Sequence, residues 1–307
     1  MLDTLLSSPL VHGLFQFFRD AAATLPIIVA LGLVLGRRGH GAFCLAGAHW
    51  LTHLALGLAC IGLAGLACQL LHIIVLLHGA GRTAAEFPLW SPLLLPHSLA
   101  LVCWLAGMCW LGLEWRISGR SVASFCSPVD RYTLADIKAQ LWLSALAALC
   151  FFGSYVIQTW PFVSLPQGMS LGQAATAIIR DKAHYYFTAL APAGAMAMLS
   201  LPVARQKLEG LAPPETWAKA GRWCALWAVV GYIPYWLNSS ATCIGYALRG
   251  GPSLTGTLLL LLLPLTGAII CWAVMLSLRN PLRHFWLNWL GLSLLLFFFL
   301  VRGFLVR

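Results

Sequence analysis

The chain has 307 residues, of which 60% are hydrophobic and only 9% are charged, and its formal net charge is +10. A soluble domain carries about 25% charged residues, so this composition excludes a water-exposed globular fold. The basic residues lie in short loops between apolar runs. We therefore attribute the positive charge to membrane topology and expect no nucleic-acid partner.

The apolar runs predict a single polytopic domain over residues 1–307, an all-α bundle of about eight transmembrane helices. The first run is short for a bilayer, so some of residues 15–20 are expected to belong to this span, while residues 10–18 could instead form an interfacial amphipathic helix. The second run is too long for one simple crossing and is expected to tilt, with Gly62 and Gly65 as candidate bending points. A nine-span alternative splits this run. The expected spans are 21–36, 43–78, 93–113, 139–162, 183–204, 223–248, 254–278 and 285–304.

The basic residues are distributed unevenly between alternate loops. Twelve of the 19 Lys and Arg residues fall in one set of loops and seven in the other. The positive-inside rule places the richer set in the cytoplasm. With eight spans, both termini then lie outside a bacterial-type cytoplasmic (inner) membrane.

The loops contain no sign of a soluble catalytic unit. The longest, residues 114–138 and 205–222, are too short for one, and no P-loop, dinucleotide-binding or H-E-x-x-H motif occurs. Glu114 and Asp20 are expected at the ends of spans, so no carboxylate is predicted at mid-membrane. This pattern counts against proton-coupled transport.

The nine histidines carry most of the functional information. An imidazole within a span can ligate haem iron, bind or deprotonate a quinol, or relay protons, and it can also simply donate to a neighbouring helix. The predicted topology sorts eight of them into two layers. Near the outer face lie His72, His78, His97 and His184, and near the cytoplasmic face lie His40, His49, His53 and His284.

Helical spacing limits the haem ligands that these layers offer. His49 and His53 are four residues apart and share one helical face, so they cannot clamp one iron between them. One of them could ligate while the other assists. The outer layer draws its histidines from three helices. It predicts a haem b held by His184 and one of the residues His72, His78 and His97.

The outer layer also suits a quinol. A histidine paired with a carboxylate accepts a proton from a quinol hydroxyl, and His184 has Asp181 before it and Tyr185 after it. Asp181 and Tyr185 are therefore candidate quinol contacts. The alternative is that Arg180, Asp181 and Lys182 are only a solvated helix start, with Asp181 favoured by the N-terminal dipole.

The middle of the chain resembles a known family. Residues 139–206 contain a span that ends at Trp160, a loop with Pro166, then His184 and a Gly194-Ala195-Met196 stretch. This pattern is similar to the fourth and fifth spans of the large subunit of cytochrome bd quinol oxidase. The resemblance implies that His184 ligates a b-type haem near the outer face.

The same family has paired glutamates in its third span and a long quinol-binding loop after its sixth, and this chain has neither. The resemblance therefore implies a shortened, haem-binding, quinone-linked relative and not oxygen reduction.

These observations predict a membrane cytochrome b-like or quinone-interacting subunit of a respiratory electron-transfer complex. Its cofactors would be haem b and quinone. A soluble or iron–sulfur redox subunit would dock on a membrane face, and any catalytic role would be that of a quinone-linked oxidoreductase subunit. The alternative is a permease or transporter subunit with structural histidines. A third interpretation is a membrane assembly factor without a cofactor.

Overall fold

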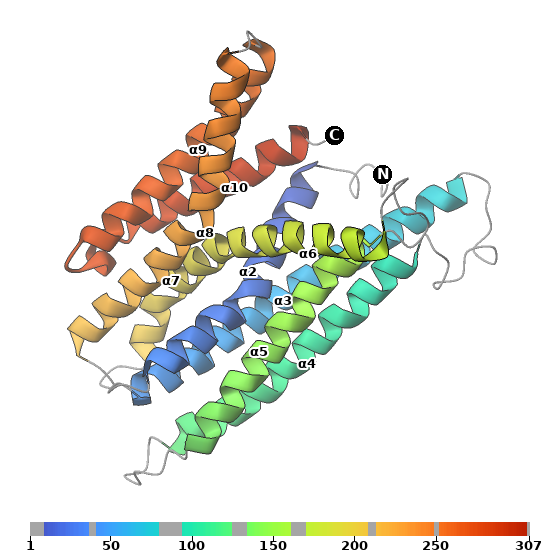
Figure 1. Cartoon of the computed structure of the whole chain (residues 1–307). Coiled ribbons are helices and arrows are strands. Elements are labelled where there is room, and N and C mark those ends of the chain that lie inside the picture. The colour runs from blue at the N-terminus through green and yellow to red at the C-terminus, as the bar shows by residue number, and fades with distance from the viewer. Residues whose placement is uncertain are drawn as a thin grey trace.

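The computed structural model describes residues 9–36, 41–79, 94–124, 134–160, 170–207, 213–248 and 252–305. These residues form nine α-helical segments and one short 3-10 helix, η1 (Figure 1). Strands are absent from this part of the chain. The elements are α2 (Pro9–Gly36), α3 (Gly41–Gly79), α4 (Leu95–Ser124), α5 (Leu134–Gln158), α6 (Leu171–Thr188), α7 (Leu190–Lys207), α8 (Pro214–Leu248), α9 (Pro252–Ser277), η1 (Pro281–His284) and α10 (Trp286–Leu305).

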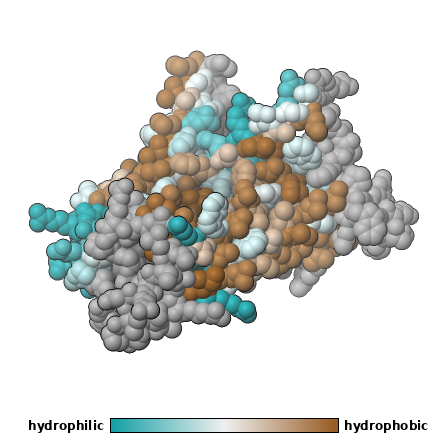
Figure 2. Space-filling view, turned by 60° about the horizontal axis from the view of Figure 1, so that its bottom comes forward, coloured by the Kyte–Doolittle hydropathy of each residue, from teal (hydrophilic) through white to brown (hydrophobic). Residues whose placement is uncertain are grey.

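Among the described residues, six helical stretches are long and apolar enough to cross a membrane, which makes the chain a multi-pass helical membrane protein by length and composition. Apolar residues cover most of the described surface in Figure 2, as expected for contact with lipid. α10 carries a shorter apolar stretch, Trp286–Val301. The six candidate spans are Gly13–Val34, Ala46–Leu77, Leu95–Gly119, Ile137–Gln158, Leu171–Lys207 and Leu259–Ser277.

α2 and α7 lie at the centre of the bundle. In the candidate span of α2, about two thirds of the most apolar stretch is buried inside the protein, and in the span that covers α6 and α7 the buried share is 72%. In the other four candidate spans the buried share is only 17% to 33%. Small residues make this close packing of backbones feasible, as in the Ala21-Ala22-Ala23 run of α2 and the Ala/Gly-rich α7. α3, α4, α5 and α9 therefore present most of their surface to lipid.

α2 and α3 settle two points that the sequence left open. α2 begins at Pro9, so residues 10–18 belong to the first membrane helix and are not a separate interfacial helix. α3 is one helix of 39 residues, which excludes the nine-span alternative. Gly62 and Gly65 do not interrupt it. They serve close packing instead, because an added Cβ would lie 2.5 Å from Trp104 or 2.9 Å from Phe15.

The expected span 183–204 lies within the candidate span Leu171–Lys207, but it is not a single helix. α6 begins at Leu171, ends at Thr188, and is followed after Ala189 by a separate α7. Pro192 explains the break, because it has no N–H to donate to the carbonyl of Thr188 and its ring clashes there. In Figure 1, α6 crosses α5 obliquely, and α7 then turns away beside α2 and α8.

α8 and α9 each contain an internal proline, Pro234 and Pro264. Proline inside a helix removes one backbone hydrogen bond and bends the axis. Just beyond these prolines, Trp236 Nε1 donates to Thr266 Oγ at 2.8 Å and ties the two helices together. The C-terminal part of α8 and the start of α9 form a hairpin that projects from the rest of the bundle (Figure 1).

Candidate functional site

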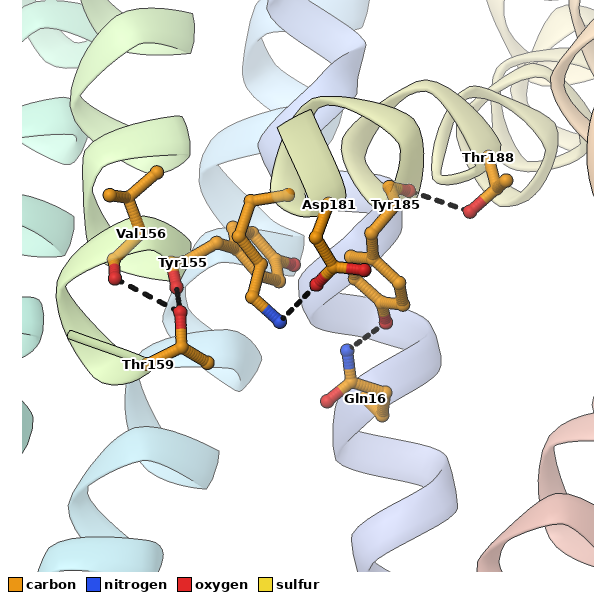
Figure 3. Close-up of polar contacts among 8 residues, drawn as sticks. Gln16, Tyr155, Val156, Thr159, Asp181, Tyr185 and Thr188 are labelled. Atoms are coloured by element: carbon orange, nitrogen blue, oxygen red, sulfur yellow. Dashed lines mark hydrogen bonds and ion pairs between the residues drawn. The ribbon is translucent and has the colours of Figure 1, made fainter. Parts of the chain in front are cut away.

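A buried hydrogen-bond network surrounds Asp20 on α2. Its carboxylate accepts from Tyr155 and Gln16 at Oδ1 and from Tyr185 at Oδ2, each at 2.7 Å. The Gln16 amide also contacts the Tyr185 hydroxyl, and Figure 3 shows Tyr185 reaching from α6 toward Gln16 on α2. Asp20 is 2% exposed. Three donors from three helices therefore hold this carboxylate within the bundle.

Arg19 is the positive charge of the same network and is only 8% exposed. Its guanidinium donates to the side-chain oxygens of Gln158 and Gln16, both at 3.0 Å, and lies 4.5 Å from the ring centroid of Tyr155. Its Nε has no hydrogen-bond partner among the described residues. We call Gln16, Arg19, Asp20, Tyr155, Gln158 and Tyr185 the Asp20 network.

A cavity of about 440 Å³ opens on this network between α2, α5 and α6. We call it the α2–α6 cavity. Its volume falls in the range of small-molecule sites. It combines donors, a carboxylate and an imidazole with apolar surface from Phe299. Its polar lining comprises Gln16, Arg19, Tyr155, Gln158, Thr159, Asp181, Lys182, His184, Tyr185, Thr188, Tyr235 and Asn238.

A second cavity, the α3–α4 cavity, has a volume of about 380 Å³ and shares Gln158 and Thr159 with the first. Its lining is mainly apolar, with Val11, Phe15 and Ile73 among its residues. The side chain of Gln158 forms hydrogen bonds on both sides of the boundary between the two cavities. Its amide nitrogen donates at 3.2 Å to Gln69, which lines the α3–α4 cavity, and its amide oxygen accepts from Arg19, which lines the α2–α6 cavity. The remaining lining residues are Gly65, Cys68, Gln69, His72 and His97.

The predicted outer histidines fall into these two cavities. His72 of α3 and His97 of α4 are half-buried and share the α3–α4 cavity. His97 Nδ1 is buried and has no hydrogen-bond partner in the described part of the chain. His184 is exposed and lines the α2–α6 cavity together with Asp181 and Tyr185. The side chain of His78 lies outside the described residues.

Asp181 is not at a helix start, so the N-terminal dipole does not explain it. α6 begins at Leu171, where Ser170 and Gln173 form a reciprocal capping box. Asp181 is thus in the middle of the helix, and its carboxylate pairs with Lys182 at 3.2 Å (Figure 3). Both line the α2–α6 cavity.

The other two predicted histidines, His49 and His53, lie near the opposite end of the bundle. His49 Nδ1 is 2.7 Å from Ser118 Oγ of α4, and its ring stacks on Trp115 at 6.1 Å between centroids. His53 is exposed and its ring lies 6.2 Å from the same Trp115 ring. The contacts with α4 account for the position of both rings on one face of α3.

The expectation that acids occur only at span ends is wrong. Asp20 lies more than two turns inside α2, because this helix starts at Pro9. Glu114 lies well inside α4, because the helix continues to Ser124, and Glu114 is completely buried. Both carboxylates are within candidate membrane spans. The sequence argument against proton-coupled transport therefore loses its basis.

Among the described residues, no group of three or more His, Cys, Asp and Glu side chains is placed to hold a metal ion. A haem needs only two axial ligands, and His72 and His97 approach one cavity from different helices. These two are therefore the described histidines that best fit a bis-histidine site.

No family model, no curated protein and no solved structure matches this sequence. The functional argument consequently rests on the site itself.

Sequence reasoning missed most of the Asp20 network. The signal in α2 was the polar run Gln16, Arg19 and Asp20 within an apolar stretch, because ionisable residues inside a span usually mark a functional site. Tyr155 and Gln158 gave no comparable signal. Their role depends on the packing of α5 against α2, which no local pattern reveals.

Proposed function

We propose that this chain is the quinone-interacting membrane subunit of a respiratory electron-transfer complex, with the quinone headgroup in the α2–α6 cavity. The observation that carries the proposal is the convergence of Arg19, Tyr185, His184 and Asp181 on one cavity of about 440 Å³. A quinone carbonyl needs a hydrogen-bond donor, and a quinol hydroxyl needs a proton acceptor. This cavity offers both kinds of group.

Arg19 and Gln158 are the donors best suited to a quinone carbonyl. Arg19 is held by three neighbours and lines the cavity. A donor fixed in this way costs little reorganisation when it binds a ligand. Asp20 is engaged by three donors, so its role is to balance the charge of Arg19 and orient the ring hydroxyls.

His184 and Asp181 are the proton acceptors in this proposal. Both are exposed on α6 and line the same cavity, so protons taken from a quinol can leave to water. Oxidation of one quinol to quinone releases two protons and two electrons. The protons pass to His184 and Asp181, and the electrons pass to a one-electron carrier of the complex.

Haem b is the carrier that the α3–α4 cavity would suit, since a haem accepts and donates one electron at a time. His72 and His97 would hold it from α3 and α4. Gln158 lines both cavities, so the two proposed sites are adjacent. A soluble or iron–sulfur subunit would complete the path at a membrane face.

The proposal includes the eight-span topology, with both termini outside a bacterial inner membrane. α8 and α10 then cross in addition to the six candidate spans. The α2–α6 and α3–α4 cavities lie near the outer face in this topology. The support is the positive-inside bias of the loops and the 35-residue length of α8.

A transporter or permease subunit remains the second candidate function. One observation favours it: Asp20 and Glu114 are both buried inside candidate spans. Ionisable residues at such positions are typical of substrate and ion pathways.

The proposed function is tested by two measurements on the purified protein. A Soret band with a reduced α-band reports haem, and quenching of tryptophan fluorescence by a short-tailed ubiquinone analogue reports the quinone site. His184→Ala should weaken analogue binding about tenfold, which corresponds to about 1.4 kcal/mol. His284→Ala, an exposed histidine of η1, is the matched control and should bind normally.

Equal analogue affinity in His184→Ala and wild type would contradict the quinone assignment. Absence of any haem absorbance would remove His72 and His97 as ligands but leave the quinone site standing.

A further inference from the structure

A second group of buried polar side chains lies between α3, α4 and α5, toward the end of the bundle opposite the Asp20 network. All five members are completely buried. We call them the Glu114 cluster. They comprise Thr52, Glu114, Ser118, Gln140 and Ser144.

The oxygens of this cluster are poorly matched by donors. Thr52 Oγ donates to Glu114 Oε1 at 2.8 Å. Ser144 lies against the same carboxyl, and among the described residues neither its Oγ nor Glu114 Oε2 has a hydrogen-bond partner of good geometry. Gln140, one turn earlier on α5, has no partner for its amide oxygen or its amide nitrogen within the described part of the chain. Buried polar atoms without a partner are rare and point to a bound water, ion or ligand.

The charge of Glu114 is also unmatched within the described part of the chain. No ion pair joins Glu114 to a basic side chain there. The neighbouring basic residues on its own and the facing helix, Arg116 and Lys138, are exposed. This differs from Asp20, which has Arg19 beside it. A buried carboxylate without a counter-charge either takes a proton or binds a cation.

We propose that the Glu114 cluster binds one monovalent alkali cation, Na⁺, through Glu114 Oε2, Ser144 Oγ and Gln140 Oε1. Three of the four unpartnered atoms are oxygens, which are the ligands that hard cations prefer. One carboxylate neutralises a single positive charge, so a divalent ion would leave an uncompensated charge in the bundle. The Ser144 hydroxyl can donate to Oε2, but this leaves the amide oxygen of Gln140 without a donor, whereas a cation serves all three oxygens.

A polar side chain one turn away offers a route to this site. Ser118 follows Glu114 by four residues on α4, and its hydroxyl contacts His49. His49 is half-buried, and His53, one turn further along α3, is exposed. The cation site is therefore reached from the end of the bundle where α3 begins and α4 ends. It goes beyond the quinone proposal and does not depend on it.

Binding of ²²Na⁺ to the full-length protein in detergent tests this site directly. Wild type should bind one Na⁺ per chain in choline chloride buffer. Glu114→Gln keeps the shape of the side chain but removes its charge, and it should lower binding at least tenfold. Ser144→Ala should weaken binding less. Glu215→Gln, an exposed carboxylate at the start of α8, and Ser154→Ala, a buried serine elsewhere on α5, are matched controls and should bind as wild type.

Thermal unfolding provides a second readout. Na⁺ that binds only the folded state should raise the Tm of wild type by a few degrees over choline at equal ionic strength, and this rise should vanish in Glu114→Gln. Three results would overturn the proposal: no Na⁺ bound by wild type, equal binding by Glu114→Gln, or stabilisation that follows pH but not Na⁺. The last would show that Glu114 is simply protonated. None of these outcomes bears on quinone binding, which is measured separately.

Discussion

Asp20 and Glu114 are two carboxylates buried in the same membrane bundle, and their surroundings differ sharply. Asp20 accepts three hydrogen bonds and has Arg19 next to it. Glu114 accepts from Thr52, while its Oε2 and the nearby Gln140 amide have no hydrogen-bond partner among the residues that the structure describes. The comparison shows that burial alone does not define the role of an acid. A carboxylate whose two oxygens both accept hydrogen bonds stabilises the packing of the helices around it. A carboxylate with an oxygen that accepts none can still bind a ligand, as we propose for Glu114.

The largest effect is expected for Asp20→Ala. The change leaves Arg19 as an uncompensated buried cation and removes the acceptor of Tyr155 and Tyr185, which should cost about 3–5 kcal/mol of stability. Thermal unfolding in detergent measures this loss. A Tm within one or two degrees of wild type would show that the Asp20 network is not a structural framework.

The double variant Arg19→Met/Asp20→Leu tests whether the uncompensated charge of Arg19 causes the loss of stability in Asp20→Ala. It removes both charges together and replaces them with apolar side chains, so it should be clearly more stable than Asp20→Ala. Quinone-analogue binding should nevertheless fall, because the donor Arg19 is lost. If the double variant is as unstable as the single one, the hydrogen bonds of Gln16 and the two tyrosines matter more than charge balance.

Tyr155→Phe is expected to have a smaller effect. It removes one donor to Asp20 but keeps the ring that lies against Arg19. The expected loss is about 1.5–3 kcal/mol, typical of a hydrogen bond to a charged group. Phe152→Leu, on the same helix but outside the network, controls for general loss of aromatic packing. A loss in Tyr155→Phe no larger than in this control would contradict the assigned role.

The smallest effect, and the one of opposite sign, is expected for Gln140→Leu in Na⁺-free buffer. Its amide is completely buried and has no partner among the described residues, so an apolar side chain of similar size should be neutral or stabilising. In Na⁺ the advantage should disappear, because wild type then gains stability from the bound cation. Destabilisation by Gln140→Leu in both buffers would show that this amide is satisfied in the folded protein.

The sequence predicted the features that depend on local pattern. Apolar runs located the membrane helices, and α3 is one long helix as its unbroken hydropathy suggested. The break at Ala189 was missed, although Pro192 and the Ser170–Gln173 capping box were visible signals for two helices. The start of α2 was placed too late, because the charges of Arg19 and Asp20 were taken as the edge of the membrane.

The candidate site was predictable only in part. Asp181, His184 and Tyr185 were named from their proximity in sequence, and they do line one cavity. Their partners Gln16, Arg19, Tyr155 and Gln158 come from other helices, so their convergence depends on helix packing and rotation. The pairing of His72 with His97, apart from His184, likewise follows from how α3 packs on α4. Hydropathy and spacing carry no information on these choices.

Photolabelling by an azido-quinone with a short tail tests the central claim most directly. The purified protein is irradiated with the probe, digested and mapped by mass spectrometry, with excess unlabelled quinone as competitor. We predict competable labels on the segments that line the α2–α6 cavity, namely residues 13–19, 155–159, 181–188 and 235–238, and on Phe299. Competable labels confined to other helices, or labels that excess quinone does not suppress, would contradict the account.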